Sequence, residues 1–193
     1  FSAIESEIKS AAGVVRRLIG PEVFDRAEKY YNSTDFGTQN DTLDQRLLKA
    51  IQAPVAQLAM VRFYQQNTLS HEDGGRKVKI NEGSEKMPWQ WQYDRDDDAL
   101  LDKYYRALDD LYIFLEENTV SEWQKSPLRT KLAACFVKDL DTFQEVFPLE
   151  DSHRMFYILV PFMLEVQDRI IRPIVGDEEL SLIHISEPTR RRG

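Results

Sequence analysis

The sequence predicts an all-α protein: a bundle of about six helices, two of them kinked by proline, with a small β-hairpin inserted near residues 68–82. Apolar residues recur at spacings of three and four along most of the chain, as on the buried face of a helix. Period-two alternation, which is typical of a strand, is confined to one short segment. With 42% hydrophobic and 30% charged residues, the composition is that of a packed globular protein.

The first two helices are predicted at the N-terminal end. Residues 3–19 carry a single apolar stripe, with most charged side chains on other faces of the helix. Gly20 and Pro21 end this helix and start the next, because glycine suits a helix C-terminus and proline fits a first turn. The second helix is short and is expected to reach Tyr31.

A long third helix is expected after a polar segment. Asp41 and Thr42 offer a side-chain cap for its N-terminus. Pro54 lies inside the apolar pattern, which continues in phase beyond it. Proline lacks the amide hydrogen and its ring clashes with the preceding turn, so we expect a kink at this position rather than an end.

The helical period is lost between residues 68 and 88. Asp73-Gly74-Gly75 is typical of a tight turn, and the alternation over residues 77–80 is typical of a strand. A two-stranded ribbon is only marginally stable unless it packs on a helix or on another subunit. The exposed edge of this hairpin is therefore a candidate contact surface.

Further helices are predicted in the second half of the chain. A wide apolar face covers residues 87–118, and Pro127 introduces another helix that is expected to run through Val137 or beyond. Phe143, Val146 and Phe147 are expected to close this part of the core.

The last native helix is expected to start at Asp151 or Ser152, both good caps, and to run to Pro173. Pro161 should bend it, as Pro54 bends the third helix. No internal repeat or low-complexity linker divides the chain. One helical domain over residues 1–180 is the simplest organisation.

The terminal residues 181–193 resemble a translated sequencing adapter, on the stretch SLIHISEPTR from Ser181 to Arg190. We therefore expect an artefactual tail there and a natural protein that continues beyond about Leu180. This expectation removes His184 and the terminal arginines from the candidate functional residues.

Charge and composition argue against several classes of function. A net charge of -8 does not suit a protein that binds the nucleic-acid backbone, which needs a basic surface. No stretch approaches the roughly 20 apolar residues of a membrane span. Cys135 is the single cysteine and lies in an apolar run, where a buried, inert thiol is expected. The absence of a disulfide framework fits a reducing cytoplasm.

No catalytic constellation is visible in the sequence, so we expect neither enzyme activity nor a cofactor. A phosphate-binding loop, Gly-x-Ser-x-Gly and Gly-x-Gly-x-x-Gly are all absent. Four aspartates lie within residues 94–98, but the glycine and glutamate of a calcium-binding loop do not follow them. A solvated first turn of a helix is the favoured interpretation of this acidic cluster.

A ferritin-like helical metalloenzyme is the alternative from a different class of protein. Glu150 and His153 have the spacing of a di-iron ligand pair, and Glu165 could add a carboxylate. Such a site needs a second Glu-x-x-His pair, which the sequence does not contain. His71 lies in the predicted hairpin and cannot complete the set. A surface or capping role for His153 is therefore favoured.

Trp89 and Trp91 begin an aromatic group that continues with Tyr93, Tyr104 and Tyr105. Core packing is the favoured interpretation of this group, over a stacking platform. The two tryptophans straddle a helix start, however, and exposed tryptophans beside a hairpin would mark a protein interface. The candidate interface residues are Asp73, Gly74, Gly75, Val78, Ile80, Trp89 and Trp91.

A series of short motifs is spread along residues 41–176. They are the hydrophobic stretch at 56–63, the turn Asp73-Gly74, LYIFLEEN at 111–118, WQKS at 123–126, Phe143, SHRMF at 152–156, PFM at 161–163 and IIRPIVG at 170–176. Their order resembles an uncharacterised family encoded in phages and prophages of gut Bacteroidetes. Members of that family extend past the last motif, in agreement with a missing C-terminal region.

The resemblance implies a structural component of the virion, such as a head-tail connector or a head-completion protein, assembled in the bacterial cytoplasm. Such a protein would form a homo-oligomeric ring and would contact portal or tail components. The family offers no catalytic residue to carry over. A third possibility is a host helical protein-binding module, which would be a stable monomer or dimer with one discrete partner.

Overall fold

A computed structural model describes residues 2–38, 41–67, 70–72, 75–77 and 89–176, and the helices in these residues confirm the all-α class. None of them is long and apolar enough to cross a membrane. The chain divides into two compact units, residues 1–123 and 124–193. The single domain expected over residues 1–180 stays a prediction, and each unit is described by itself.

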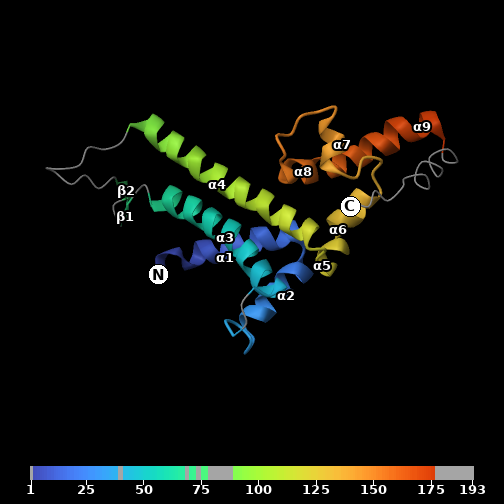
Figure 1. The fold of residues 1–193 in the computed structure, drawn as a ribbon. Helices are drawn as coiled ribbons and strands as arrows, with labels where there is room; N and C mark the ends of the chain where they lie inside the picture. Colours follow the sequence, from blue (N-terminus) through green and yellow to red (C-terminus); the bar gives the residue numbers. More distant parts are fainter. Residues whose placement is uncertain (1, 39–40, 68–69, 73–74, 78–88, 177–193) are drawn as a thin grey trace. The chain divides into compact units, whose positions relative to one another are not determined.

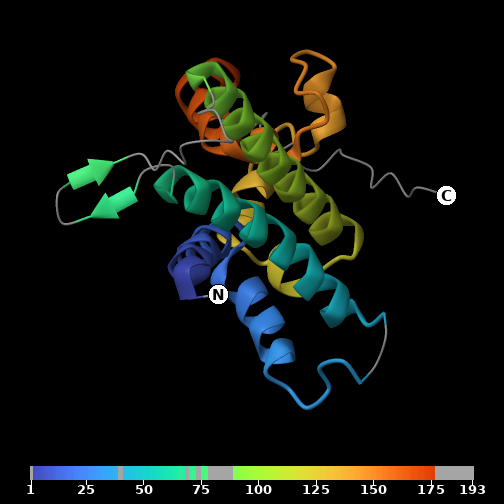
Figure 2. The same ribbon diagram turned by 90° about the vertical axis from the view of Figure 1, so that its left-hand side faces the viewer.

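The helices of the first unit pack around α3. Figure 1 shows α3 alongside α4, and the turned view in Figure 2 shows α1 and α2 on α3. The elements are α1 (Ser2–Ile19), α2 (Pro21–Tyr31), α3 (Leu43–Asn67), α4 (Gln90–Glu117) and α5 (Ser121–Gln124), whose last residue begins the second unit.

Local signals in the sequence set the starts of α2 and α3. Gly20 has a φ of 93°, which glycine adopts without strain, and Pro21 occupies the first position of α2. Before α3, the Thr42 Oγ accepts a hydrogen bond from the Gln45 N–H at 3.2 Å. The Gln45 side chain in turn accepts one from the Asp41 N–H at 2.7 Å. The predicted cap is therefore confirmed.

The core of the first unit joins three helices that are distant in sequence. One buried cluster consists of Ala11, Leu58, Ala59, Tyr104 and Leu108, from α1, α3 and α4. In α5 the fully buried Trp123 packs on the Tyr112 ring of α4, with the centroids 5.7 Å apart. The Trp123 Nε1–H donates a hydrogen bond to Glu116 at 2.6 Å, so the indole is buried with its polar group paired.

Two prolines lie inside long helices, as the sequence predicts. Pro54 is buried within α3, and Pro161 is exposed within α8 (His153–Val166). Both helices continue on each side of the proline. The bends expected at the two positions stay predictions.

Two short strands follow α3. β1 (Ser70–Glu72) pairs antiparallel with β2 (Gly75–Lys77), and His71 lies opposite Arg76. The rest of the predicted hairpin, including its turn and residues 78–82, lies outside the described residues. The hairpin over 68–82 as a whole stays a prediction, and the strands leave the all-α class unchanged.

The second unit is built around α8. Its elements are α6 (Pro127–Ala133), α7 (Leu140–Gln144), α8, the π-helical segment η1 (Gln167–Ile171) and α9 (Arg172–Val175). Side-chain oxygens of Ser126, Asp139 and Ser152 cap α6, α7 and α8, which confirms Ser152 as the predicted cap. α6 packs on α8.

The structure corrects two predictions in this unit. The helix predicted from Pro127 through Val137 or beyond ends at Ala133. The Gln167 side chain binds the backbone that follows, because its Nε2 donates a hydrogen bond to the Ala134 carbonyl and its Oε1 accepts one from the Phe136 N–H, both at 3.0 Å. Val146 and Phe147, expected in the core, are 90% and 59% exposed. The short α7 ends before them, so no helical period carries them to the buried face.

Candidate functional site

The predicted contact surface is described only in part. Asp73, Gly74, Val78 and Ile80 lie outside the described residues, and Gly75 lies in β2 opposite Glu72. Trp89 and Trp91 are described, and they place the candidate site at the start of α4.

Both tryptophans are exposed at the N-terminus of α4. The Trp89 N–H donates a hydrogen bond to the Gln92 Oε1, and its carbonyl accepts one from the Gln92 N–H, both at 2.8 Å. This exchange fixes the start of the helix. Trp89 is 73% exposed and Trp91 is 59% exposed. Both indoles are therefore exposed at the start of α4, and the two residues together are called here the tryptophan edge.

Core packing, the favoured interpretation of the aromatic group, is wrong for the tryptophans and right for Tyr104. Tyr104 is 6% exposed and belongs to the buried cluster of the first unit. It lies more than three turns after the tryptophan edge, and it is the first buried side chain among those described in α4. The periodicity that identified the helix did not show where its buried face begins.

The proposed metal ligands are not assembled. Among the described residues, no three His, Cys, Asp or Glu side chains come close enough to hold a metal ion. Glu150 precedes α8 and has a φ of 53°, so its spacing to His153 is not helical. Glu165 pairs with Arg169 at 3.3 Å. The acidic cluster at 94–98 lies inside α4 but after its first turn, which contains no acidic residue, so its interpretation as a first helix turn is wrong.

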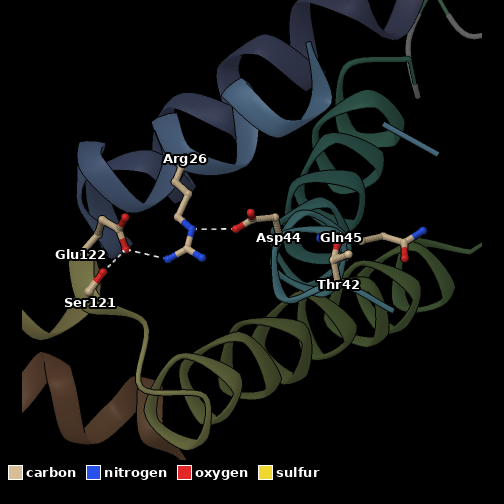
Figure 3. A network of polar contacts seen from close by, with 6 residues as sticks. All are labelled: Arg26, Thr42, Asp44, Gln45, Ser121 and Glu122. Carbon is tan, nitrogen blue, oxygen red and sulfur yellow. Dashed lines mark hydrogen bonds and ion pairs between the residues drawn. The ribbon is translucent and has the colours of Figure 1, made fainter. Parts of the chain in front are cut away.

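A network of ion pairs joins α2 to the starts of α3 and α5 (Figure 3). The Arg26 Nε donates to the Asp44 Oδ1 at 2.7 Å, and its Nη1 donates to the Glu122 Oε2 at 2.9 Å. The Ser121 Oγ donates to the same Glu122 oxygen in Figure 3, at 2.8 Å. We call Arg26, Asp44 and Glu122 the Arg26 clamp.

The clamp shifts the pKa of two of its members. Burial raises the pKa of Glu122, but hydrogen bonds from Ser121 and Arg26 lower it more, and the net pKa is below the ordinary value. Burial lowers the pKa of Arg26, whereas its bonds to Asp44 and Glu122 raise it, with a net increase. Both groups therefore stay charged at neutral pH.

An open cleft of about 1000 Å³ lies beside the clamp. Carboxylates outnumber cations among its lining residues, which are Glu22, Asp25, Arg26, Glu28, Lys29, Tyr30, Asn32, Ser33, Asp35, Asp44 and Glu122. The one cation of the clamp is already paired with two carboxylates, so its first role is structural. No sequence pattern indicates the clamp, because Arg26 lies 18 and 96 positions from its two partners.

The second unit contains an apolar groove of about 320 Å³. Its lining residues are Cys135, Phe136, Val137, Phe143, Leu159, Phe162, Met163, Val166, Gln167 and Ile171. Cys135 is 1% exposed, which confirms the predicted burial, and that burial raises the pKa of the thiol. A buried thiol with a raised pKa has little thiolate and is a poor nucleophile.

Comparison with known proteins identifies the family. Residues 15–131 match a family of unknown function, DUF6712, and this segment runs from α1 to α6. No curated protein and no solved structure matches the chain. Because the match covers more than half of the 193 residues, the chain belongs to the DUF6712 family of unknown function.

Proposed function

We propose that this protein is a structural component that acts through contacts between protein molecules. The observation that carries the proposal is the exposure of Trp89 and Trp91, at 73% and 59%. Tryptophan is enriched in the residues that dominate binding energy at protein interfaces. Gln92 fixes the helix start that presents both indoles, so little order has to be gained on binding.

Exposed apolar side chains in the second unit support the same proposal. Phe162, Ile170 and Ile174 are 60%, 56% and 79% exposed. Large apolar groups that gather on a surface usually mark an interaction site. A protein that works by its surface needs such groups, whereas an enzyme needs convergent polar groups in a pocket.

The resemblance to a phage-encoded family makes the proposal more specific. The protein acts in the virion as a head-tail connector or head-completion protein, and its copies form a ring that contacts portal or tail proteins. Portal, capsid and terminase genes beside this gene would support the assignment. A metalloenzyme would instead carry stoichiometric iron or manganese, and a host binding module would not form rings.

Tryptophan fluorescence tests the tryptophan edge directly. Acrylamide quenches exposed indoles, so Trp89 and Trp91 should account for most of the quenching, while the buried Trp123 contributes little. We expect quenching to fall as the protein assembles at higher concentration. Replacing both residues (Trp89→Ser and Trp91→Ser) should weaken assembly at least tenfold.

Tyr105→Ser is the matched control, since Tyr105 lies on the same helix and is 38% exposed. It should assemble like the wild type. Assembly with unchanged quenching would show that the copies meet at another surface, and the tryptophan edge would then lose its role.

A further inference from the structure

The second unit carries a row of exposed apolar side chains at every fourth position. The row consists of Ile158, Phe162, Val166, Ile170 and Ile174, which are 47%, 60%, 46%, 56% and 79% exposed. It runs without interruption through α8, η1 and α9. We call these residues the 158–174 row.

The π-helical segment limits the drift of this row around the helix. An α-helix turns through about 400° in four residues, so a row with this spacing moves about 40° around the helix at each step. A π-helix has more residues per turn, so the same four residues turn less and move the row back. η1 covers residues 167–171, in the second half of the row. With a rise of about 1.5 Å per residue, the row is about 24 Å long.

An apolar groove follows one side of the row. The groove is lined by residues that each follow a member of the row by one position, namely Leu159, Met163 and Ile171. Phe136 and Phe143 complete this lining. Phe162 and Val166 belong to both the row and the groove. A ridge and a groove thus share one surface. This arrangement suits a two-fold interface, where the same patch serves both partners.

One pair of opposite charges lies on the other side of the row. Glu165 and Arg169, each one position before a residue of the row, are exposed and 3.3 Å apart. When the rows of two copies pack antiparallel, the charged side of one copy faces the charged side of the other. The groove side of one copy likewise faces the groove side of the other. With Val166 at the two-fold axis, Glu165 of each copy lies next to Arg169 of the other. In a parallel pair, each charged side would face the apolar groove of its partner, at a cost in desolvation.

We propose that a second copy of this chain docks on the 158–174 row, antiparallel to the first and with Val166 at the two-fold axis. The proposal rests on the proposed function, because it names one contact through which copies of the chain associate. It assigns the apolar surface of the second unit to self-association, separately from the tryptophan edge.

Charge reversal tests the pairing and its direction. Glu165→Arg gives a copy with two cations beside the row, and Arg169→Glu gives a copy with two anions, so each variant should repel itself. We expect each to dissociate at least tenfold more readily than the wild type in sedimentation equilibrium. An equimolar mixture should recover the association as a 1:1 heterodimer, because cations then face anions across the two-fold axis. The internal pair within each helix is not repaired in the mixture, so recovery reports the contact between copies.

Two valines provide a matched pair for the row itself. Val166→Asp should weaken association at least tenfold, whereas Val146→Asp should not, since Val146 is 90% exposed and outside the row. If the two variants have the same helical signal in their circular dichroism spectra, both are folded. With air as the oxidant, Val166→Cys should also form a disulfide between copies, while the buried Cys135 should not.

The outcomes separate this inference from the proposed function. If Val166→Asp associates as strongly as the wild type, the inference is overturned, while assembly through another surface stays possible. If each charge variant dissociates alone and their equimolar mixture does not recover the association, the antiparallel pairing is overturned. A wild type that stays monomeric at every concentration would overturn both, and it would point to a different occupant of the row.

Discussion

Replacing Arg26 with methionine tests the energetic role of the Arg26 clamp. The change removes two hydrogen-bonded ion pairs, at 2.7 and 2.9 Å, and keeps most of the side-chain volume. Bonds to buried charged groups contribute about 1.5–3 kcal/mol each, and exposed pairs about 0–1 kcal/mol. The three side chains are 26%, 40% and 30% exposed, between these limits. We therefore expect a loss of about 1–2 kcal/mol in the free energy of unfolding, measured by urea titration.

The pH dependence of this loss gives a second test. The pKa of Glu122 is lowered in the folded protein, so its contribution is complete above the pKa of the unfolded chain. That contribution disappears as the pH falls through the lower, folded pKa. The difference between wild type and Arg26→Met should therefore be largest at neutral pH and should shrink in acid.

Arg16→Met is the matched control for the clamp. Arg16 forms one pair with Asp25 at 2.8 Å, and these side chains are 45% and 51% exposed. Its replacement should cost less than about 1 kcal/mol, because solvent screens exposed pairs. Equal losses for the two variants, or a loss for Arg26→Met that does not change with pH, would refute the reasoning.

Three further predictions concern single residues. Trp123→Ala should lower the free energy of unfolding by about 3–5 kcal/mol, since the indole is fully buried and pairs with Glu116; a loss below about 1 kcal/mol in urea titration would contradict this burial. Thr119→Gly should raise the free energy of unfolding by about 1 kcal/mol, because Thr119 has a φ of 48° directly after the cap residue Asn118, where glycine is favoured. Thermal unfolding checks it, and an unchanged midpoint would count against strain at this position. Cys135 should react slowly with a disulfide reagent in the folded protein and rapidly in urea, because burial raises its pKa. Equal rates in the two states would show that the thiol is accessible.

Local signals made much of the fold predictable. Glycine and proline at positions 20 and 21 and the Ser152 cap fixed helix boundaries through residues that are neighbours in sequence. The early end of α6 was not predictable in this way. It depends on the Gln167 amide, more than thirty positions from the backbone groups that it binds.

The position of the tryptophan edge at a helix start could be predicted from the sequence, whereas the exposure of its side chains could not. The sequence placed Trp89 and Trp91 at a helix start, but their burial depends on whether another helix covers that end of α4. Val146 and Phe147, which an apolar pattern assigned to the core, are exposed for another reason, because α7 ends before them. The Arg26 clamp joins residues of ordinary surface type, so no spacing in the sequence indicates it.

Sedimentation equilibrium of the wild-type protein over a range of concentrations tests most directly whether this protein works through contacts between its copies. Exposed tryptophans and a self-complementary apolar row predict an average mass that rises above the 22.6 kDa of one chain as concentration increases. A mass that stays at 22.6 kDa at every concentration would contradict the account.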